Sequence, residues 1–399
     1  MLRKFIFGSG VFALSVLAFS LIRQIIVFPA ISRYSDDLFV ELTFMVFTFE
    51  AIAYGFTGAI PDYYVRRLQG SGVDAVLMRK LSKLCLTSLA SFVGFFLFGL
   101  GFIVSLLLSI YLCLFSLNAL KIKIVFNKLQ FAENFVYMAF RSIPYLVLLW
   151  ATYSEAAWIK GEELKWTAGL LLITEACYFF RLKSITRQDM ENAIPVYREY
   201  EIQDSLFYSI LPFIVSALMM GFIQRGDLTI VKLLDTSYYT GYAKLILTVN
   251  FFCAPLALMI SSPLLSFMSR YDLSLKSPDM HRIIGGVAIL VAAISLTTSL
   301  SFNFVYAQLY AGSYNGSTWF IFFITAMTLS YALVRTLTTK YAKAKPLLLT
   351  NILLVLILAL LSKLISIQIF VVFFYTARVF IYSGLLLIDA MKIGPNKTT

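Results

Sequence analysis

The chain has 399 residues, of which 60% are apolar and only 14% are charged, whereas soluble domains carry about 25% charged residues. This composition excludes an ordinary soluble domain. The formal charge of +12 does not predict a nucleic-acid partner, because Lys and Arg gather between apolar runs and form no basic patch interleaved with aromatic residues. The four cysteines lie inside apolar runs without metal-ligand spacing, and we interpret them as small packing residues.

Apolar runs long enough to cross a bilayer follow one another along the whole chain. They fall at about 5–28, 38–59, 84–101, 103–120, 131–151, 166–182, 205–224, 240–264, 284–302, 318–334, 346–362 and 368–388. A crossing needs about 20 apolar residues, so the sequence predicts an all-α polytopic membrane protein with about twelve transmembrane helices. The least secure division is at Gly99 and Gly101. The first run lacks a cleavage signal and is predicted to be a span.

The distribution of positive residues predicts the orientation. With the N-terminus inside, cytoplasmic segments carry 23 of the 33 Lys and Arg residues and external segments carry 6. Positive residues are retained on the cytoplasmic side. We therefore expect a multi-pass protein of the bacterial cytoplasmic membrane with both termini in the cytoplasm.

The longest hydrophilic stretch divides the chain into two similar parts. We expect an N-terminal lobe at 1–182, a cytoplasmic linker at 183–204 and a C-terminal lobe at 205–399, with six helices in each lobe around a central cavity. Shifting the sequence by 202 residues places Arg23 on Arg225, Ser35 on Ser237 and Pro61 on Pro263. Such a shift is typical of parallel repeats in transporters.

Four ionisable residues lie near the middle of predicted spans: Glu50, Arg141, Glu175 and Arg378. Each costs about 2.5–3.5 kcal/mol at mid-span, so they face partners or a wet cavity. Arg141 either pairs with Glu50 or Glu175 as a structural ion pair, or serves the function of the protein. Arg378 has no acidic mid-span partner in its own lobe, which favours substrate binding.

Two of these arginines sit on polar helix faces with steps of three and four residues. The faces are Asn134, Tyr137, Arg141 and Tyr145 in one span, and Gln368, Tyr375, Arg378 and Tyr382 in another. Tyrosine offers an apolar ring and a polar tip, which suits sugar rings. The candidate substrate-binding residues are Arg23, Arg141, Arg225, Lys244, Arg378, Tyr145 and Tyr375, and the candidate ion-coupling residues are Glu50, Glu175 and Asp227.

Three of these cations lie near the outer ends of spans, where long side chains reach the interface. For Arg23 and Arg225 a function and an interface role both remain open, whereas Lys244 is predicted to be an interface anchor. Asp227 follows Arg225 by two residues and so does not share its helix face. The single histidine, His281, belongs to no Cys/His cluster, and no phosphate loop or nucleophile motif is present. We therefore expect no catalytic residue, no metal and no cofactor.

Residues 211–227 and the stretch that follows resemble the seventh span and next loop of Wzx-like polysaccharide flippases, a branch of the multidrug/oligosaccharidyl-lipid/polysaccharide exporter superfamily. The resemblance is carried by Pro212, the acidic Asp227, and Gly241-Tyr242 at the start of the eighth span. Ala243 follows where the family often has serine. Gly55–Ile60 and the basic pair Arg66-Arg67 also look like the family's second span and its exit loop.

The resemblance implies alternating access and a cargo of undecaprenyl-diphosphate-linked oligosaccharide for O-antigen, lipopolysaccharide or capsule. Its partners would be this lipid-linked oligosaccharide, membrane lipids and, for coupling, H⁺ or Na⁺. Arginine suits a diphosphate because its planar fork bonds two oxygens at once.

Three other hypotheses remain open. A MATE-type cation or drug antiporter has the same architecture and is supported by Glu50 and Glu175. A membrane-embedded polysaccharide polymerase usually carries a long external loop, whereas the longest predicted here is about 15 residues, near 303–317. A scaffold gives no reason for buried charges on polar helix faces.

Overall fold

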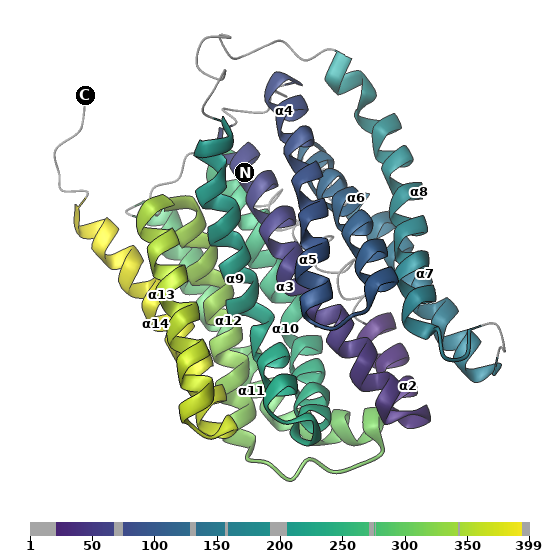
Figure 1. Ribbon diagram of the computed structural model, residues 1–399. Helices are drawn as coiled ribbons and strands as arrows, with labels where there is room; N and C mark the ends of the chain where they lie inside the picture. Colours follow the sequence, from purple (N-terminus) through teal and green to yellow (C-terminus); the bar gives the residue numbers. More distant parts are fainter. Residues whose placement is uncertain are drawn as a thin grey trace, which may run out of the picture. The chain divides into compact units, whose positions relative to one another are not determined.

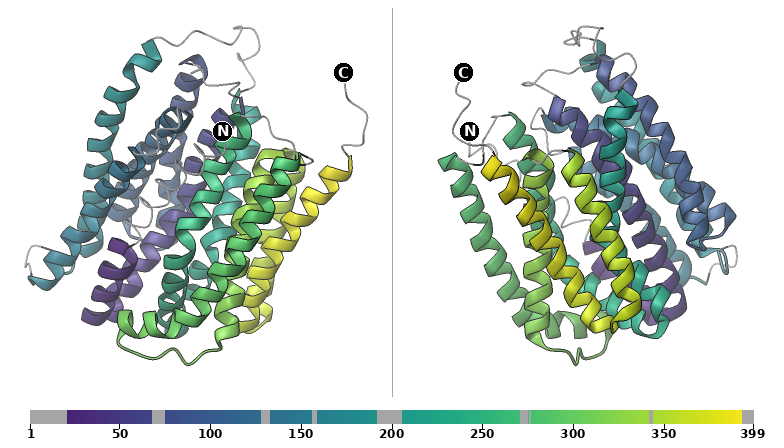
Figure 2. Two further views of the ribbon diagram at one scale, coloured as in Figure 1. Left: turned by 180° about the vertical axis from the view of Figure 1, so that it is seen from behind. Right: turned by 60° about the vertical axis from the view of Figure 1, so that its left-hand side comes forward.

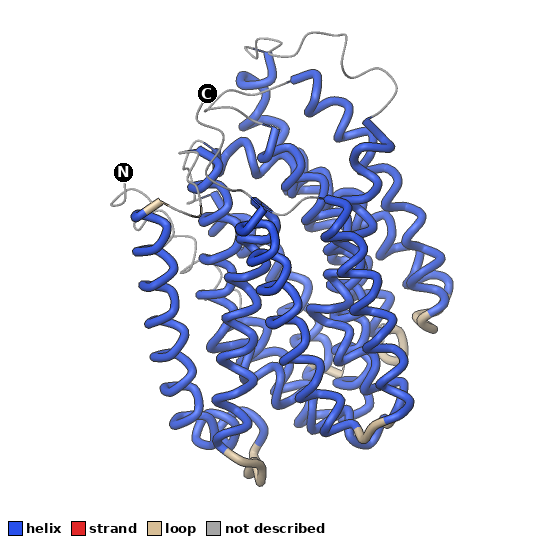
Figure 3. Tube along the Cα trace, turned by 90° about the vertical axis from the view of Figure 1, so that its left-hand side faces the viewer, coloured by secondary structure: helices blue, strands red, loops and turns tan. Residues whose placement is uncertain are grey.

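The computed structural model describes residues 21–67, 75–127, 133–155, 159–191, 206–270, 275, 277–341 and 344–392. Within these ranges every regular element is helical (Figure 3). Residues 1–20, which hold most of the predicted first span, and the predicted linker at 192–204 lie outside the described part of the chain.

The first described elements are η1 (Leu21–Val27), a π-helix, α2 (Phe28–Tyr34) and α3 (Asp36–Arg67). The third predicted span consists of α4 (Ala75–Cys85), η2 (Leu86–Ala90) and α5 (Ser91–Leu97), and α6 (Phe102–Asn127) follows it (Figure 1). Gly99 and Gly101 form the turn between α5 and α6 with φ of +80° and +73°. Because glycine adopts positive φ without a steric penalty, the predicted division at these residues is confirmed.

The middle of the chain forms four further helices: α7 (Glu133–Tyr153), α8 (Glu163–Glu191), α9 (Leu206–Leu234) and α10 (Thr236–Arg270). The stretch after Asp227, predicted to be a loop, is helical except at Asp235. The Asp235 carboxylate caps α10 by accepting hydrogen bonds from the Ser237 and Tyr238 amides at 2.9 and 3.2 Å. Hydrogen bonds from the Ser237 hydroxyl and the Tyr238 amide hold the pKa of Asp235 below its usual value.

The last four helices are α11 (Pro278–Tyr310), α12 (Thr318–Tyr341), α13 (Ala344–Leu364) and α14 (Ile367–Lys392), and Figure 2 shows them from two further sides. The predicted external loop at 303–317 is wrong in its first half, because α11 continues to Tyr310. Aromatic rings one turn apart stabilise this extension. Phe302 stacks on Tyr306 at 5.7 Å, and Tyr306 contacts Tyr310 at 5.2 Å.

Seven helices in the described ranges are long and apolar enough to cross a membrane, and α9 is an eighth if its two segments, bent by 57°, form one span. Each predicted span from the second to the twelfth coincides with a helix or, for the third, with the α4–η2–α5 series. The predicted all-α polytopic membrane fold is confirmed.

Contacts group the chain into two compact units, residues 1–244 and 245–399. The first unit therefore includes α9 and the first turns of α10, which the predicted lobe at 205–399 assigns to the C-terminal part. The division into lobes at 1–182 and 205–399 stays a prediction.

Helices α3 and α9 approach each other closely within the first unit. A Cβ atom at Gly221 would lie 1.9 Å from the carbonyl oxygen of Ala51, and one at Gly55 would lie 2.3 Å from Cγ of Leu218. Small residues allow such close approach between membrane helices. The two glycines thus fix which helix α3 packs against.

The starts of α3 and α10 are alike. Ser35 interrupts the helix before α3 and accepts a hydrogen bond from the Leu38 amide at 3.2 Å, as Asp235 does before α10. These caps are 200 residues apart, so the shift of 202 that aligns Ser35 with Ser237 does not align the caps. The correspondence of Arg23 with Arg225 stays a prediction, because the side chain of Arg225 lies outside the described structure.

Candidate functional site

A small cavity opens among the helices of the first unit, and the predicted charged residues line it. The space open to the centre of a water-sized sphere is about 10 Å³, which is about what one water molecule needs. Its lining residues are Arg23, Met45, Val46, Phe49, Glu50, Leu108, Tyr111, Arg141, Tyr145 and Leu171. Tyr145 is buried and meets the Phe28 ring edge-on at 6.2 Å.

Arg23 and Glu50 form an ion pair at this cavity. The Nη1 atom of Arg23 donates to Oε1 of Glu50 at 2.8 Å, and the two side chains are 8% and 23% exposed. Sequence reasoning paired Glu50 with Arg141, but the ion pair that the structure shows for Glu50 is with Arg23. The π-helix η1 carries Arg23 into the interior beside α3, an arrangement that helical spacing in the sequence does not predict.

Glu175 lies fully inside the first unit, with 1% of its surface exposed. Its Oε1 atom accepts hydrogen bonds from Nδ2 of Asn118 at 2.7 Å and from the Tyr137 hydroxyl at 3.0 Å. Arg141 is the nearby positive charge that acts on it. The carboxylate is therefore held by side chains of α6 and α7, one turn along α8 from the cavity residue Leu171.

Arg141 lies among aromatic rings of α6 and α7. Its Nη2 atom donates to the Tyr111 hydroxyl at 3.4 Å. Its guanidinium lies 4.4 Å from the Phe115 ring centroid and 5.6 Å from that of Tyr137. The predicted polar face of this span is confirmed for Tyr137, Arg141 and Tyr145, while the side chain of Asn134 lies outside the described residues.

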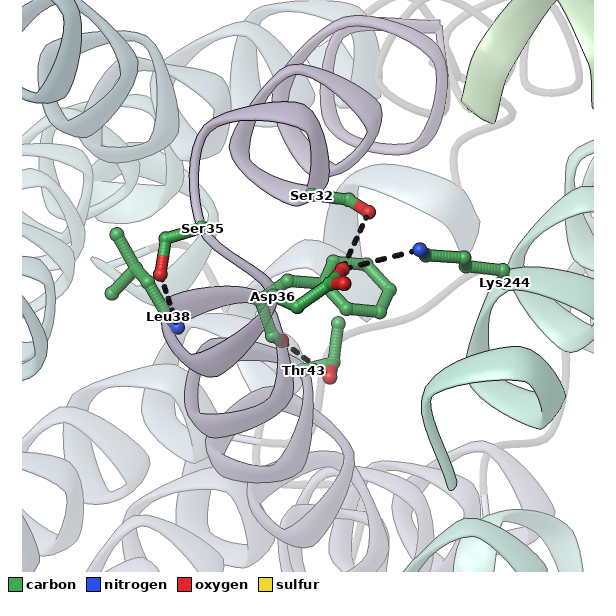
Figure 4. A network of polar contacts seen from close by, with 7 residues as sticks. Ser32, Ser35, Asp36, Leu38, Thr43 and Lys244 are labelled. Carbon is green, nitrogen blue, oxygen red and sulfur yellow. Dashed lines mark hydrogen bonds and ion pairs between the residues drawn. The ribbon is translucent and has the colours of Figure 1, made fainter. Parts of the chain in front are cut away.

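The starts of α3 and α10 are joined by polar contacts within the first unit (Figure 4). The Lys244 ammonium lies 3.2 Å from Oδ1 of Asp36, which also accepts from Ser32 at 3.4 Å. The Tyr239 hydroxyl donates to Oγ1 of Thr43 at 3.1 Å. Lys244, predicted to be an interface anchor, thus holds two helix starts together.

Asp227 is likewise bonded inside the protein. It is 1% exposed, and its Oδ2 atom accepts a hydrogen bond from the Tyr242 hydroxyl at 2.6 Å. Two residues that carry the flippase resemblance therefore contact each other. An assignment of Asp227 to ion coupling stays a prediction, because the contact with Tyr242 also suits a purely structural role.

In the second unit, Arg378 is 2% exposed and lies inside a cage of aromatic side chains. Its guanidinium carbon is 4.0 Å from the Tyr375 ring centroid, 4.9 Å from Tyr331 and 5.5 Å from Phe374. Its Nη2 atom donates to Oγ1 of Thr328 at 3.1 Å. The predicted face of Tyr375, Arg378 and Tyr382 is confirmed as buried.

Sequence reasoning missed three of these partners: Asn118, Tyr111 and Thr328. Asn118 had a signal, because it is the one side-chain amide in the run at 103–120. Tyr111 and Thr328 had none, since tyrosine and threonine occur throughout the apolar runs.

The helices and their buried charges define a polytopic all-α membrane protein built like a transporter. No protein-family model matches the sequence, and no curated protein matches it. Three solved structures show the same fold. An outward-facing conformation of a multidrug resistance MATE family transporter of the MOP superfamily has a TM-score of 0.65 at 10% identity, with 98% of this chain and 96% of that chain covered.

A crystal structure of MATE in complex with Br-NRF gives a TM-score of 0.60 at 11% identity, with 98% of this chain and 96% of that chain covered. An inward-facing MATE family transporter of the MOP superfamily gives 0.52 at 12% identity, with coverage of 96% and 94%. These similar structures are transporters and not enzymes. They belong to the MATE branch of the superfamily in which the sequence resemblance placed the flippases.

Proposed function

We propose that this protein is a MATE-type, ion-coupled membrane transporter that works by alternating access. The observation that carries the proposal is Glu175, a fully buried carboxylate bonded to two neutral donors beside a cavity. A buried ionisable residue in a membrane protein marks an ion pathway or a proton relay by default. The fold shared with MATE transporters supports the same function.

Proton uptake at Glu175 would change its hydrogen bonding and its charge together. The ionised carboxylate accepts from Asn118 and Tyr137, whereas a protonated carboxyl group also has a proton to donate. Protonation also removes the negative charge that acts on Arg141. Arg141 lines the cavity, so the ionisation of Glu175 changes the electrostatic field where a cargo would bind.

A second candidate is a flippase for undecaprenyl-diphosphate-linked oligosaccharides. It is favoured by the buried Arg378, which no cationic cargo would require, and by the sequence resemblance at residues 211–242. Its site residues would be the cations Arg23, Arg141, Arg225, Lys244 and Arg378, with Tyr145 and Tyr375 for the sugars.

Glu175→Gln tests the proposed coupling. Reconstituted into liposomes, the variant should lose transport driven by a proton or Na⁺ gradient while its abundance stays normal, because glutamine keeps the shape but cannot ionise. Glu155→Gln, in an exposed turn, is the matched control and should transport normally. If Glu175 only neutralises Arg141, the variant leaves a buried charge uncompensated at a cost of about 3–5 kcal/mol, and abundance should fall.

The cargo is tested by deletion in the native host followed by analysis of lipid-linked intermediates. A flippase predicts that a complete repeat unit accumulates on the cytoplasmic face. A polymerase predicts single units on the outside, and a drug antiporter predicts no change in glycan but greater sensitivity to cationic drugs.

A further inference from the structure

Helices α12 and α14 face each other in the second unit with matching polar residues. On each helix these residues follow spacings of three and then four, which place them on one face. They are Thr328, Tyr331 and Arg335 on α12, and Tyr375, Arg378 and Tyr382 on α14. Contacts join the faces at two levels: Arg378 to Thr328 at 3.1 Å, and the Tyr331 ring to the Tyr382 ring at 5.6 Å.

Arg378 is a buried cation with bonding capacity to spare. Guanidinium has five N–H donors, and the Nε atom of Arg378 is buried without a hydrogen-bond partner among the described residues. Aromatic rings attract a cation by their faces, but they supply neither negative charge nor an acceptor in the plane of the guanidinium. The cage therefore holds Arg378 in place and leaves it able to bind an acceptor.

No carboxylate in the same unit lies at the depth of Arg378. The acidic residues of the segment 245–399 are Asp272, Asp279 and Asp389. Asp279 is exposed and lies 3.6 Å from Arg282 at the start of α11. Asp389, the nearest to Arg378 along α14, is eleven residues further on, about 16 Å along the helix axis.

Arg335 adds a second cation on the same pair of faces. It lies two turns after Thr328 on α12, about 10 Å along the axis, and it interacts electrostatically with Tyr382 of α14. The Tyr382 hydroxyl in turn donates to Oδ1 of Asn351. Two long guanidinium side chains can converge on one extended anion across this distance.

We propose that this α12–α14 face, with Arg378 and Arg335 as its cations, is a binding site for a diphosphate group. A diphosphate presents several acceptor oxygens to planar forks that bond two at once, and its length and charge suit two arginines better than a single carboxylate does. The hydroxyl of Thr328 completes the site beside Arg378. The inference rests on the proposed transporter function only for its role, and it assigns the chemical class of the cargo.

The site is tested with the full chain in nanodiscs of zwitterionic lipid. Inorganic diphosphate is titrated by calorimetry in one arm, and an isoprenyl diphosphate is incorporated into the nanodisc in the other. We expect Arg378→Ala to weaken binding at least tenfold and Arg335→Gln to weaken it severalfold. Arg282→Ala, at an exposed position of the same unit, is the control and should bind like the wild type.

A binding loss in both arms identifies the diphosphate itself as the ligand, and a loss only in the lipid arm identifies a lipid head group. Arg378→Lys keeps the charge without the fork and should lose several-fold in affinity, so it serves if the alanine variant does not fold. Equal binding by the wild type and both Arg378 variants, or no binding in either arm, would overturn the site. Gradient-driven transport that depends on Glu175 would then still support the proposed function.

Discussion

The ion pair between Arg23 and Glu50 allows a quantitative test of which charges are structural. The perturbation is a double-mutant cycle with Arg23→Met, Glu50→Gln and the two changes together. Each single change leaves one charge buried without its partner, which costs about 3–5 kcal/mol in a buried pair. Since the Glu50 side chain is 23% exposed, we expect about 3 kcal/mol, the lower end of that range.

The double variant should be much more stable than the sum of the single effects predicts. Replacing both partners of a buried ion pair is often nearly neutral, so we expect a coupling free energy of about 2–3 kcal/mol, within the range for directly contacting residues. The measurement is the unfolding midpoint of the purified protein in nanodiscs, together with membrane abundance. Additive effects, or single variants as stable as the wild type, would refute the conclusion that this pair stabilises the fold.

Two further predictions concern packing and topology. Gly221→Ala should destabilise the protein by about 1–3 kcal/mol or more through overpacking, because its Cβ would lie 1.9 Å from the Ala51 carbonyl oxygen. Gly241→Ala, with open space around it, should not, and equal midpoints for the two variants would contradict the close α3–α9 contact. Reporter fusions should read cytoplasmic after Arg198 and external near Gly312, and an external signal at both sites would remove the predicted topology.

The sequence by itself determined the membrane class and the division into helices. Runs of apolar residues and the glycine pair before α6 are local properties, because both span length and positive φ depend on residues within one helix or turn. The helical period likewise placed Tyr137, Arg141 and Tyr145 on one face, and Tyr375 and Arg378 on another. The ends of helices were less predictable. Polar residues after Asp227 and Phe302 indicated loops, yet capping and stacked aromatic rings continue both helices.

Only the tertiary structure decided which charges meet. Glu50 pairs with Arg23, 27 positions away, Glu175 with Asn118, 57 positions away, and Asp36 with Lys244, 208 positions away. Each pairing depends on which helices pack together, and packing is set by complementary side-chain shapes on separate segments that no local period encodes. The glycine at 221 is the clearest case, because its meaning lies in the carbonyl group of a helix that precedes it by some 170 positions.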